Sequence, residues 1–132
     1  MLDHWPLLAA RLLTLTYLLV LTGTSAVDKV FDRAGNLGYL QGFFAKTFLK
    51  NVVGLLLTLV TLEFWAAALA LAAGLVQLLA TQERTFACIG ATLTGVTMLS
   101  LFTGQQLAKD YTGGTTIVPH LAVSLAALLL CA

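Results

Sequence analysis

The sequence contains few charged residues, and they form no basic run. Asp, Glu, Lys and Arg make up 10% of the 132 residues, against about 25% in an average soluble domain. The net charge of +1 comes from scattered residues, so nothing in the composition supports nucleic-acid binding. The hydrophobic fraction of 59% exceeds the soluble average of about 45–50%. This composition indicates an integral membrane protein.

Motifs for stand-alone chemistry are also missing. The sequence has no G-x-S-x-G elbow, P-loop, Rossmann fingerprint or zincin helix. Its two histidines, His4 and His120, are predicted on opposite faces of the membrane, so they form no paired haem or metal motif. The length leaves no room for a separate soluble catalytic domain beside the apolar segments. We therefore expect no metal site, no covalently bound cofactor and no enzymatic activity of the chain on its own.

What the sequence has instead is four apolar segments long enough to cross a bilayer, whose hydrocarbon core of about 30 Å needs about 20 helical residues. They lie at about 7–27, 52–79, 86–107 and 116–132. The chain is therefore predicted to be one all-α domain over residues 1–132, an integral membrane four-helix bundle. Small residues recur every fourth position in the second and third segments and predict close helix packing there. These are Ala66, Ala70 and Gly74, and Ala87, Ala91 and Gly95.

The first segment has a second interpretation. Arg11 can serve as the basic n-region of a secretory signal peptide, residues 12–21 as its apolar region, and Thr24-Ser25-Ala26 as a small-residue cleavage site. We favour a retained crossing.

The long connection at 28–50 carries aromatic residues with helical spacing, including the i, i+4 pair Tyr39 and Phe43. This pattern predicts a short helix in the headgroup layer at about 37–49. An ordinary loop with aromatic anchors is the alternative.

Four crossings place both termini and the short turn at 81–84 on one side, and the two longer connections on the other. Five basic residues lie on the connection side, namely Lys29, Arg33, Lys46, Lys50 and Lys109. Arg11 and Arg84 lie on the terminus side. The positive-inside rule therefore makes the connections cytoplasmic and both termini periplasmic, in the inner membrane of a bacterium.

Glu63 is the residue that fits its segment least, because a carboxylate within a bilayer is costly and commonly functional. At 1.5 Å per residue, Glu63 and Arg11 lie about 20 Å and about 25 Å from the connection side. One interpretation is an intramembrane pair between them, which would relieve the cost of burying either charge. The others are a protonated Glu63 that donates to a polar ligand, and a partner for Glu63 on another chain.

A second polar group is predicted near the connection side. Donors and acceptors at the ends of three crossings converge there with one histidine, which suits the headgroup end of a quinone or lipid site. A solvated membrane edge is the alternative. The residues are Asp28, Lys29, Gln105, Lys109, Asp110 and His120.

The sequence has only two cysteines, and no C-x-x-C. Cys88 begins the third crossing and Cys131 ends the fourth, so both are expected at the terminus-side surface. They are interpreted as small apolar packing residues, or as a disulfide if that face is periplasmic.

The order of these features resembles the DoxX-like family of small four-helix membrane proteins, over most of the chain. The resembling residues are Arg11-Leu12-Leu13, Gly23 with Asp28-Lys29-Val30-Phe31, Leu62-Glu63 before an alanine-rich stretch ending at Gly74, and residues 104–111. The resemblance implies association with membrane redox complexes, including subunits of thiosulfate:quinone oxidoreductases, while eukaryotic relatives act as chaperones or cargo receptors. The fold does not choose among these.

Two functions therefore stand as expectations. The first is a non-catalytic accessory or assembly subunit of a larger membrane complex, in contact with lipids and other membrane subunits. The second is a quinone-associated subunit of an oxidoreductase of the thiosulfate:quinone type, which predicts a cavity leading to Lys29, Gln105 and His120.

Overall fold

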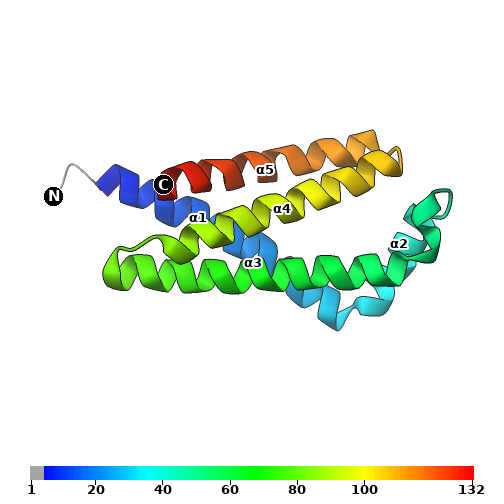
Figure 1. The fold of residues 1–132 in the computed structure, drawn as a ribbon, viewed down its shortest axis with the longest axis horizontal. Coiled ribbons are helices and arrows are strands. Elements are labelled where there is room, and N and C mark those ends of the chain that lie inside the picture. The colour runs from blue at the N-terminus through cyan, green and yellow to red at the C-terminus, as the bar shows by residue number, and fades with distance from the viewer. Residues whose placement is uncertain (1–4) are drawn as a thin grey trace.

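The computed structural model describes residues 5–132, and this part of the chain is an antiparallel bundle of helices without strands (Figure 1). Four helices are long and apolar enough to cross a membrane. The predicted all-α membrane bundle is therefore confirmed. In chain order the elements are α1 Trp5–Phe31, α2 Arg33–Phe43, the 3₁₀ helix η2 Phe48–Asn51, α3 Val53–Thr81, α4 Thr85–Leu107 and α5 Tyr111–Cys131.

The long connection contains two short helices separated by a turn. α2 begins at Arg33, before the expected start at 37, and ends at Phe43. The Thr47 hydroxyl then accepts a hydrogen bond from the Leu49 amide at 3.1 Å and so caps η2. A helix in this connection was expected, but not its division by a capping threonine.

The last helix begins earlier than expected, at Tyr111 instead of 116. The cause is Asp110, whose carboxylate accepts a hydrogen bond from the Gly113 amide at 3.0 Å and caps the helix. The pair Gly113-Gly114 therefore forms part of the first turn of α5. Pro119 then lies inside the helix.

The residues that could form a signal peptide are part of the folded bundle. α1 runs without a break through Thr24-Ser25-Ala26, and Ala26 is fully buried. Leu15 and Leu18 of the same helix are core residues. Cleavage after Ala26 would remove these core residues, so the fold described here is that of the uncleaved chain.

Two glycines allow α3 and α4 to approach closely. A Cβ atom on Gly74 would lie 2.6 Å from the Ala87 backbone nitrogen, and one on Gly90 would lie 2.9 Å from the Leu71 backbone nitrogen. The small-residue prediction is therefore right for Gly74 but wrong for Ala66, which is exposed. Gly90, which was not in the predicted pattern, makes the second close contact.

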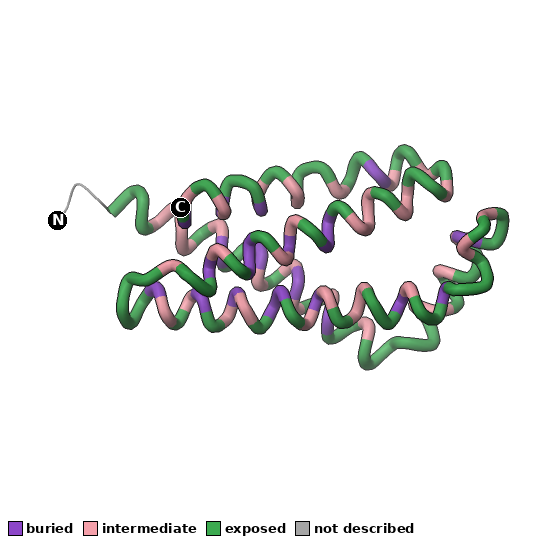
Figure 2. Tube along the Cα trace, viewed as in Figure 1, coloured by how far each residue is buried: buried purple, intermediate pink, exposed green. Residues whose placement is uncertain are grey.

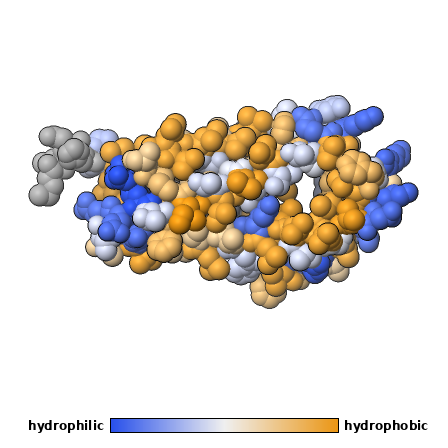
Figure 3. Space-filling view, in the orientation of Figure 1, coloured by the Kyte–Doolittle hydropathy of each residue, from blue (hydrophilic) through white to orange (hydrophobic). Residues whose placement is uncertain are grey.

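The core is concentrated in the half of the bundle that contains the termini. Figure 2 shows most buried residues there and few near the connections. One cluster at that end includes Leu15, Leu71 and Leu78, and a smaller cluster further along contains Ala26, Phe64 and Met98. Towards the connections the helices separate, and Figure 3 shows a hollow between α3 and the α4–α5 pair. The residues of the candidate site belong to this half of the bundle.

Candidate functional site

The structure does not bring Arg11 and Glu63 together. The Nε of Arg11 donates to the Leu130 carbonyl oxygen at 2.7 Å, whereas Glu63 Oε1 accepts from the Ser100 hydroxyl at 3.4 Å. Arg11 and Leu78 line one small cavity, and Leu78 lies about 22 Å along α3 from Glu63 at 1.5 Å per residue. The proposed intramembrane pair is therefore absent from this structure.

The error came from the assumed ends of the helices. α1 continues past Asp28 to Phe31, and α3 begins at Val53. Counted from these ends at 1.5 Å per residue, Arg11 is about 30 Å from the connection side and Glu63 only about 15 Å. The two side chains thus belong to opposite halves of the bundle.

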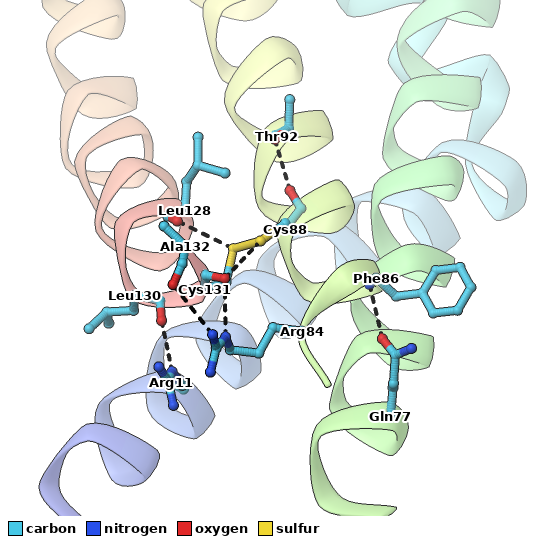
Figure 4. Close-up of a disulfide and its surroundings, with 10 residues drawn as sticks. All are labelled: Arg11, Gln77, Arg84, Phe86, Cys88, Thr92, Leu128, Leu130, Cys131 and Ala132. Carbon is cyan, nitrogen blue, oxygen red and sulfur yellow. Dashed lines mark hydrogen bonds between the residues drawn. A yellow bond between two sulfur atoms is a disulfide. The ribbon is translucent and has the colours of Figure 1, made fainter. Parts of the chain in front are cut away.

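On the terminus side, two arginines cap the C-terminal end of α5. Arg84 Nε donates to the Cys131 carbonyl at 3.2 Å and its Nη2 to the Ala132 carbonyl at 3.5 Å. Arg11 bonds the Leu130 carbonyl, as Figure 4 shows. Carbonyl groups in the last turn of a helix lack intrahelical donors, and positive charge is favourable there. Both arginines therefore have a structural explanation.

A disulfide joins Cys88 of α4 to Cys131 of α5, with 5.6 Å between their Cα atoms (Figure 4). The two sulfur atoms also lie 3.1 and 3.3 Å from the carbonyl oxygens of Cys131 and Leu128. Because a bonded sulfur has no proton to donate, these are contacts and not hydrogen bonds. The two cysteines were expected to be either apolar packing residues or a disulfide, and in the structure they form the disulfide.

On the connection side, Lys29 turns into the bundle. It continues the buried stripe of α1 that contains Leu18, Thr22 and Ala26. Its ammonium nitrogen lies 4.7 Å from the centroid of the buried Phe64 ring, within the range of a cation–π interaction. Phe64 directly follows Glu63 in α3. The contact therefore places Lys29 and Glu63 in the same region of the bundle.

Glu63 has an incomplete set of hydrogen bonds. The Ser100 hydroxyl lies 3.4 Å from Glu63 Oε1 and 3.0 Å from the Val96 carbonyl, and its single proton can serve only one of them at a time. Glu63 Oε2 is buried and has no hydrogen-bond partner among residues 5–132. A buried acceptor left in this state costs about 1–3 kcal/mol, which favours an additional donor at this place.

Gln105 is the second side chain with an unpartnered oxygen. It lies one heptad after the buried Met98, on the inward face of α4. Its Oε1 is buried and lacks a hydrogen-bond partner within the described part of the chain. An ammonium group, a carboxyl group and an amide from three helices therefore belong to the loosely packed half of the bundle. Glu63 and Gln105 each keep one oxygen that accepts no hydrogen bond from residues 5–132.

The other predicted site residues lie elsewhere. Asp28 accepts from the Asn36 side chain at 3.1 Å, and Asp110 caps α5. Lys109 is exposed in the turn before α5 with a φ of 62°. These three residues connect and cap helices. Of the predicted group this leaves Lys29 and Gln105 in the loosely packed half of the bundle, which also contains Glu63.

His120 is in the middle of α5 and not near the connection. Because α5 begins at Tyr111, His120 is about 14 Å into the helix at 1.5 Å per residue, and its Nδ1 lies 2.6 Å from the Tyr17 hydroxyl of α1. Tyr17 is 41% exposed on the outer surface of the bundle. Nothing in the local sequence pattern identified Tyr17, because the contact depends on α1 and α5 being neighbours.

The chain matches no family model, no curated protein and no solved structure. The resemblance to the DoxX-like family therefore stays a prediction.

Proposed function

We propose that this chain is a non-catalytic accessory subunit of a larger membrane complex, in the redox or electron-transport setting that the DoxX-like resemblance implies. The observation that carries the proposal is the Tyr17–His120 hydrogen bond, located halfway along α1 and α5. Tyr17 is 41% exposed there. Lipid tails cannot hydrogen-bond to polar side chains, and intramembrane polar residues normally face other protein. A partner helix across α1 and α5 would cover this pair.

Site-specific photo-crosslinking in the native membrane tests the proposal. Val20 is one turn after Tyr17 and is 59% exposed, whereas Val76 on α3 is 67% exposed and belongs to a different helix. A photoreactive residue at Val20 should give discrete protein adducts, and one at Val76 should give lipid adducts. Lipid adducts alone at both positions would contradict an interface across α1 and α5.

The proposed location is the inner membrane of a bacterium with both termini on the periplasmic side. Two independent features support this orientation. Five basic residues lie on the connection side, which the positive-inside rule makes cytoplasmic. The Cys88–Cys131 disulfide lies on the opposite side, and disulfides persist in oxidising compartments such as the periplasm.

A second function, association with a quinone, is supported by the loosely packed half of the bundle. The Lys29 ammonium is a donor suited to a quinone carbonyl, and Glu63 Oε2 and Gln105 Oε1 are acceptors suited to the hydroxyls of the quinol. The apolar tail would lie between α3 and the α4–α5 pair, where Figure 3 shows the hollow. In this function the chain binds the quinone and other subunits supply the electron-transfer chemistry.

Quinone binding can be measured on the purified protein in lipid nanodiscs with a short-chain ubiquinone. Replacing Lys29 by Met should weaken binding by about tenfold or more, since one charged hydrogen bond contributes about 1.5–3 kcal/mol. Lys109→Met is the matched control, because Lys109 is an exposed lysine on the same side. Equal affinities for wild type, Lys29→Met and Lys109→Met would contradict a site at Lys29.

A further inference from the structure

A surface pocket lies at the opposite end of the bundle from the loosely packed half, next to the disulfide. Its volume is about 440 Å³. It is formed by the turn between α3 and α4, the first turn of α4 and the end of α5. The lining residues are Gln82, Glu83, Arg84, Thr85, Cys88 and Cys131.

The two cysteines differ in their exposure. Cys131 is only 6% exposed, whereas Cys88 is half-buried. Both cysteines line the pocket, and the greater exposure of Cys88 makes it the better candidate for attack, with Cys131 as the leaving group. Thiol–disulfide exchange requires this kind of access to one sulfur.

The electrostatic surroundings favour a thiolate at Cys88, the group that leaves in the second step of an exchange. Cys88 is in the first turn of α4, where backbone amides and the helix dipole stabilise negative charge. Arg84 is held at the pocket by its bonds from Nε and Nη2 to the carbonyls of Cys131 and Ala132 (Figure 4). Its Nη1 group has no acceptor among residues 5–132. A carboxylate entering the pocket can therefore pair with this guanidinium.

We propose that the Cys88–Cys131 disulfide is an exchange site for a small thiol that carries a carboxylate. The thiolate of the incoming molecule attacks the Cys88 sulfur, the sulfur–sulfur bond breaks, and its electron pair leaves on Cys131, which takes a proton from water. A second thiolate then attacks the sulfur of the first thiol, which releases Cys88. Overall, two thiols are oxidised to a disulfide, and their two electrons and two protons reside on Cys88 and Cys131.

This exchange site is independent of the proposed quinone association, because the disulfide and Lys29 belong to opposite ends of the bundle. Reduction would also remove the covalent link between α4 and α5 beside the two capping arginines. The redox state of the surrounding compartment would thereby alter how the end of α5 is held.

The test uses the purified full chain in nanodiscs and reduced glutathione, a thiol with two carboxylates. Intact mass spectrometry after alkylation should show reduction of the disulfide in the folded protein, with the bundle intact by circular dichroism. In a Cys131→Ser variant incubated with oxidised glutathione, one glutathione should attach to Cys88. A disulfide that reacts only after denaturation in detergent and heat would overturn the proposal, and this result needs no variant.

Recognition of the carboxylate is tested by Arg84→Gln in the Cys131→Ser background. Attachment of glutathione to Cys88 should slow about fivefold, the effect of losing about 1 kcal/mol of partly exposed ion pairing. Attachment of cysteamine, which lacks a carboxylate, should not slow, and Lys46→Gln on the other side of the bundle should change neither rate. Equal slowing with glutathione and cysteamine would contradict a carboxylate site at Arg84.

Discussion

The Nε of Arg11 donates a hydrogen bond to the Leu130 carbonyl oxygen at 2.7 Å and so joins the first and last membrane-spanning helices. The guanidinium lies at the C-terminal end of α5, where backbone carbonyls lack donors and the helix dipole is negative. The arginine within the first apolar segment thus stabilises the terminus-side half of the bundle. Its partner is the backbone of α5 and not Glu63.

Replacing Arg11 by Gln should destabilise the bundle. A hydrogen bond to a charged group contributes about 1.5–3 kcal/mol, and removal leaves the Leu130 carbonyl without its donor. We expect a loss of about 2 kcal/mol in the free energy of unfolding, measured by chemical denaturation in mixed micelles. The exposed Lys46→Gln serves as the control and should change stability by less than about 0.5 kcal/mol. An Arg11→Gln protein as stable as this control would contradict the capping role.

Glu63→Gln should leave the free energy of unfolding nearly unchanged, because Glu63 has no arginine partner to lose. Its effect should also be additive with that of Arg11→Gln, within about 0.5 kcal/mol, as for distant sites. A double-mutant cycle on the same denaturation assay measures this. A coupling energy well above that limit would restore the ion pair between the two residues.

Gly74→Ala should be strongly destabilising. The added Cβ atom would lie 2.6 Å from the Ala87 backbone nitrogen, and overpacking of this kind costs about 1–3 kcal/mol. Gly54→Ala is the matched control in the same helix, because a Cβ there meets nothing within 4 Å. Gly54→Ala should be neutral or stabilising by up to about 1 kcal/mol, since alanine is the better helix former. Thermal unfolding of both variants in one detergent decides between these outcomes, and equal stabilities would argue against the close α3–α4 contact.

Tyr17→Phe should cost about 0.6 kcal/mol, the average measured for hydrogen bonds between membrane helices, and at most about 1.7 kcal/mol. The substitution removes the hydroxyl that lies 2.6 Å from His120 Nδ1 but keeps the ring. Tyr39→Phe on α2, an equally conservative change at an exposed tyrosine, should have no effect. The unfolding of the two purified variants is compared in micelles, without partner proteins. Identical unfolding curves for both variants would show that the Tyr17–His120 bond does not form.

The sequence predicted the helices well because a membrane span is a long local signal. The four crossings and the helix in the first connection follow from apolar length and from i, i+4 aromatic spacing. The ends of the helices were less predictable. At Asp110 a single side-chain cap lengthened α5 by more than one turn, and at Phe31 α1 ran past its expected end.

Those errors at helix ends then changed the predicted site. A shift of a few residues moved Arg11 away from Glu63 and placed His120 in mid-helix instead of near the connection. The neighbours of each side chain could not be predicted either, because Tyr17–His120 and Lys29–Phe64 depend on which helices pack together. Lys29, Gln105 and Glu63 were singled out from the sequence, and the structure places all three in the half of the bundle nearest the connections.

Purification from the native membrane in a mild detergent tests the proposed accessory role most directly. The affinity-tagged chain would be isolated at its natural expression level, and all co-purifying proteins would be quantified together with an absorbance scan for quinone, haem and flavin. The proposal predicts at least one other membrane subunit at a fixed stoichiometry, lost when Val20 and Tyr17 on α1 are both replaced by Arg. A chain that purifies alone in several mild detergents and after crosslinking in the membrane would contradict it.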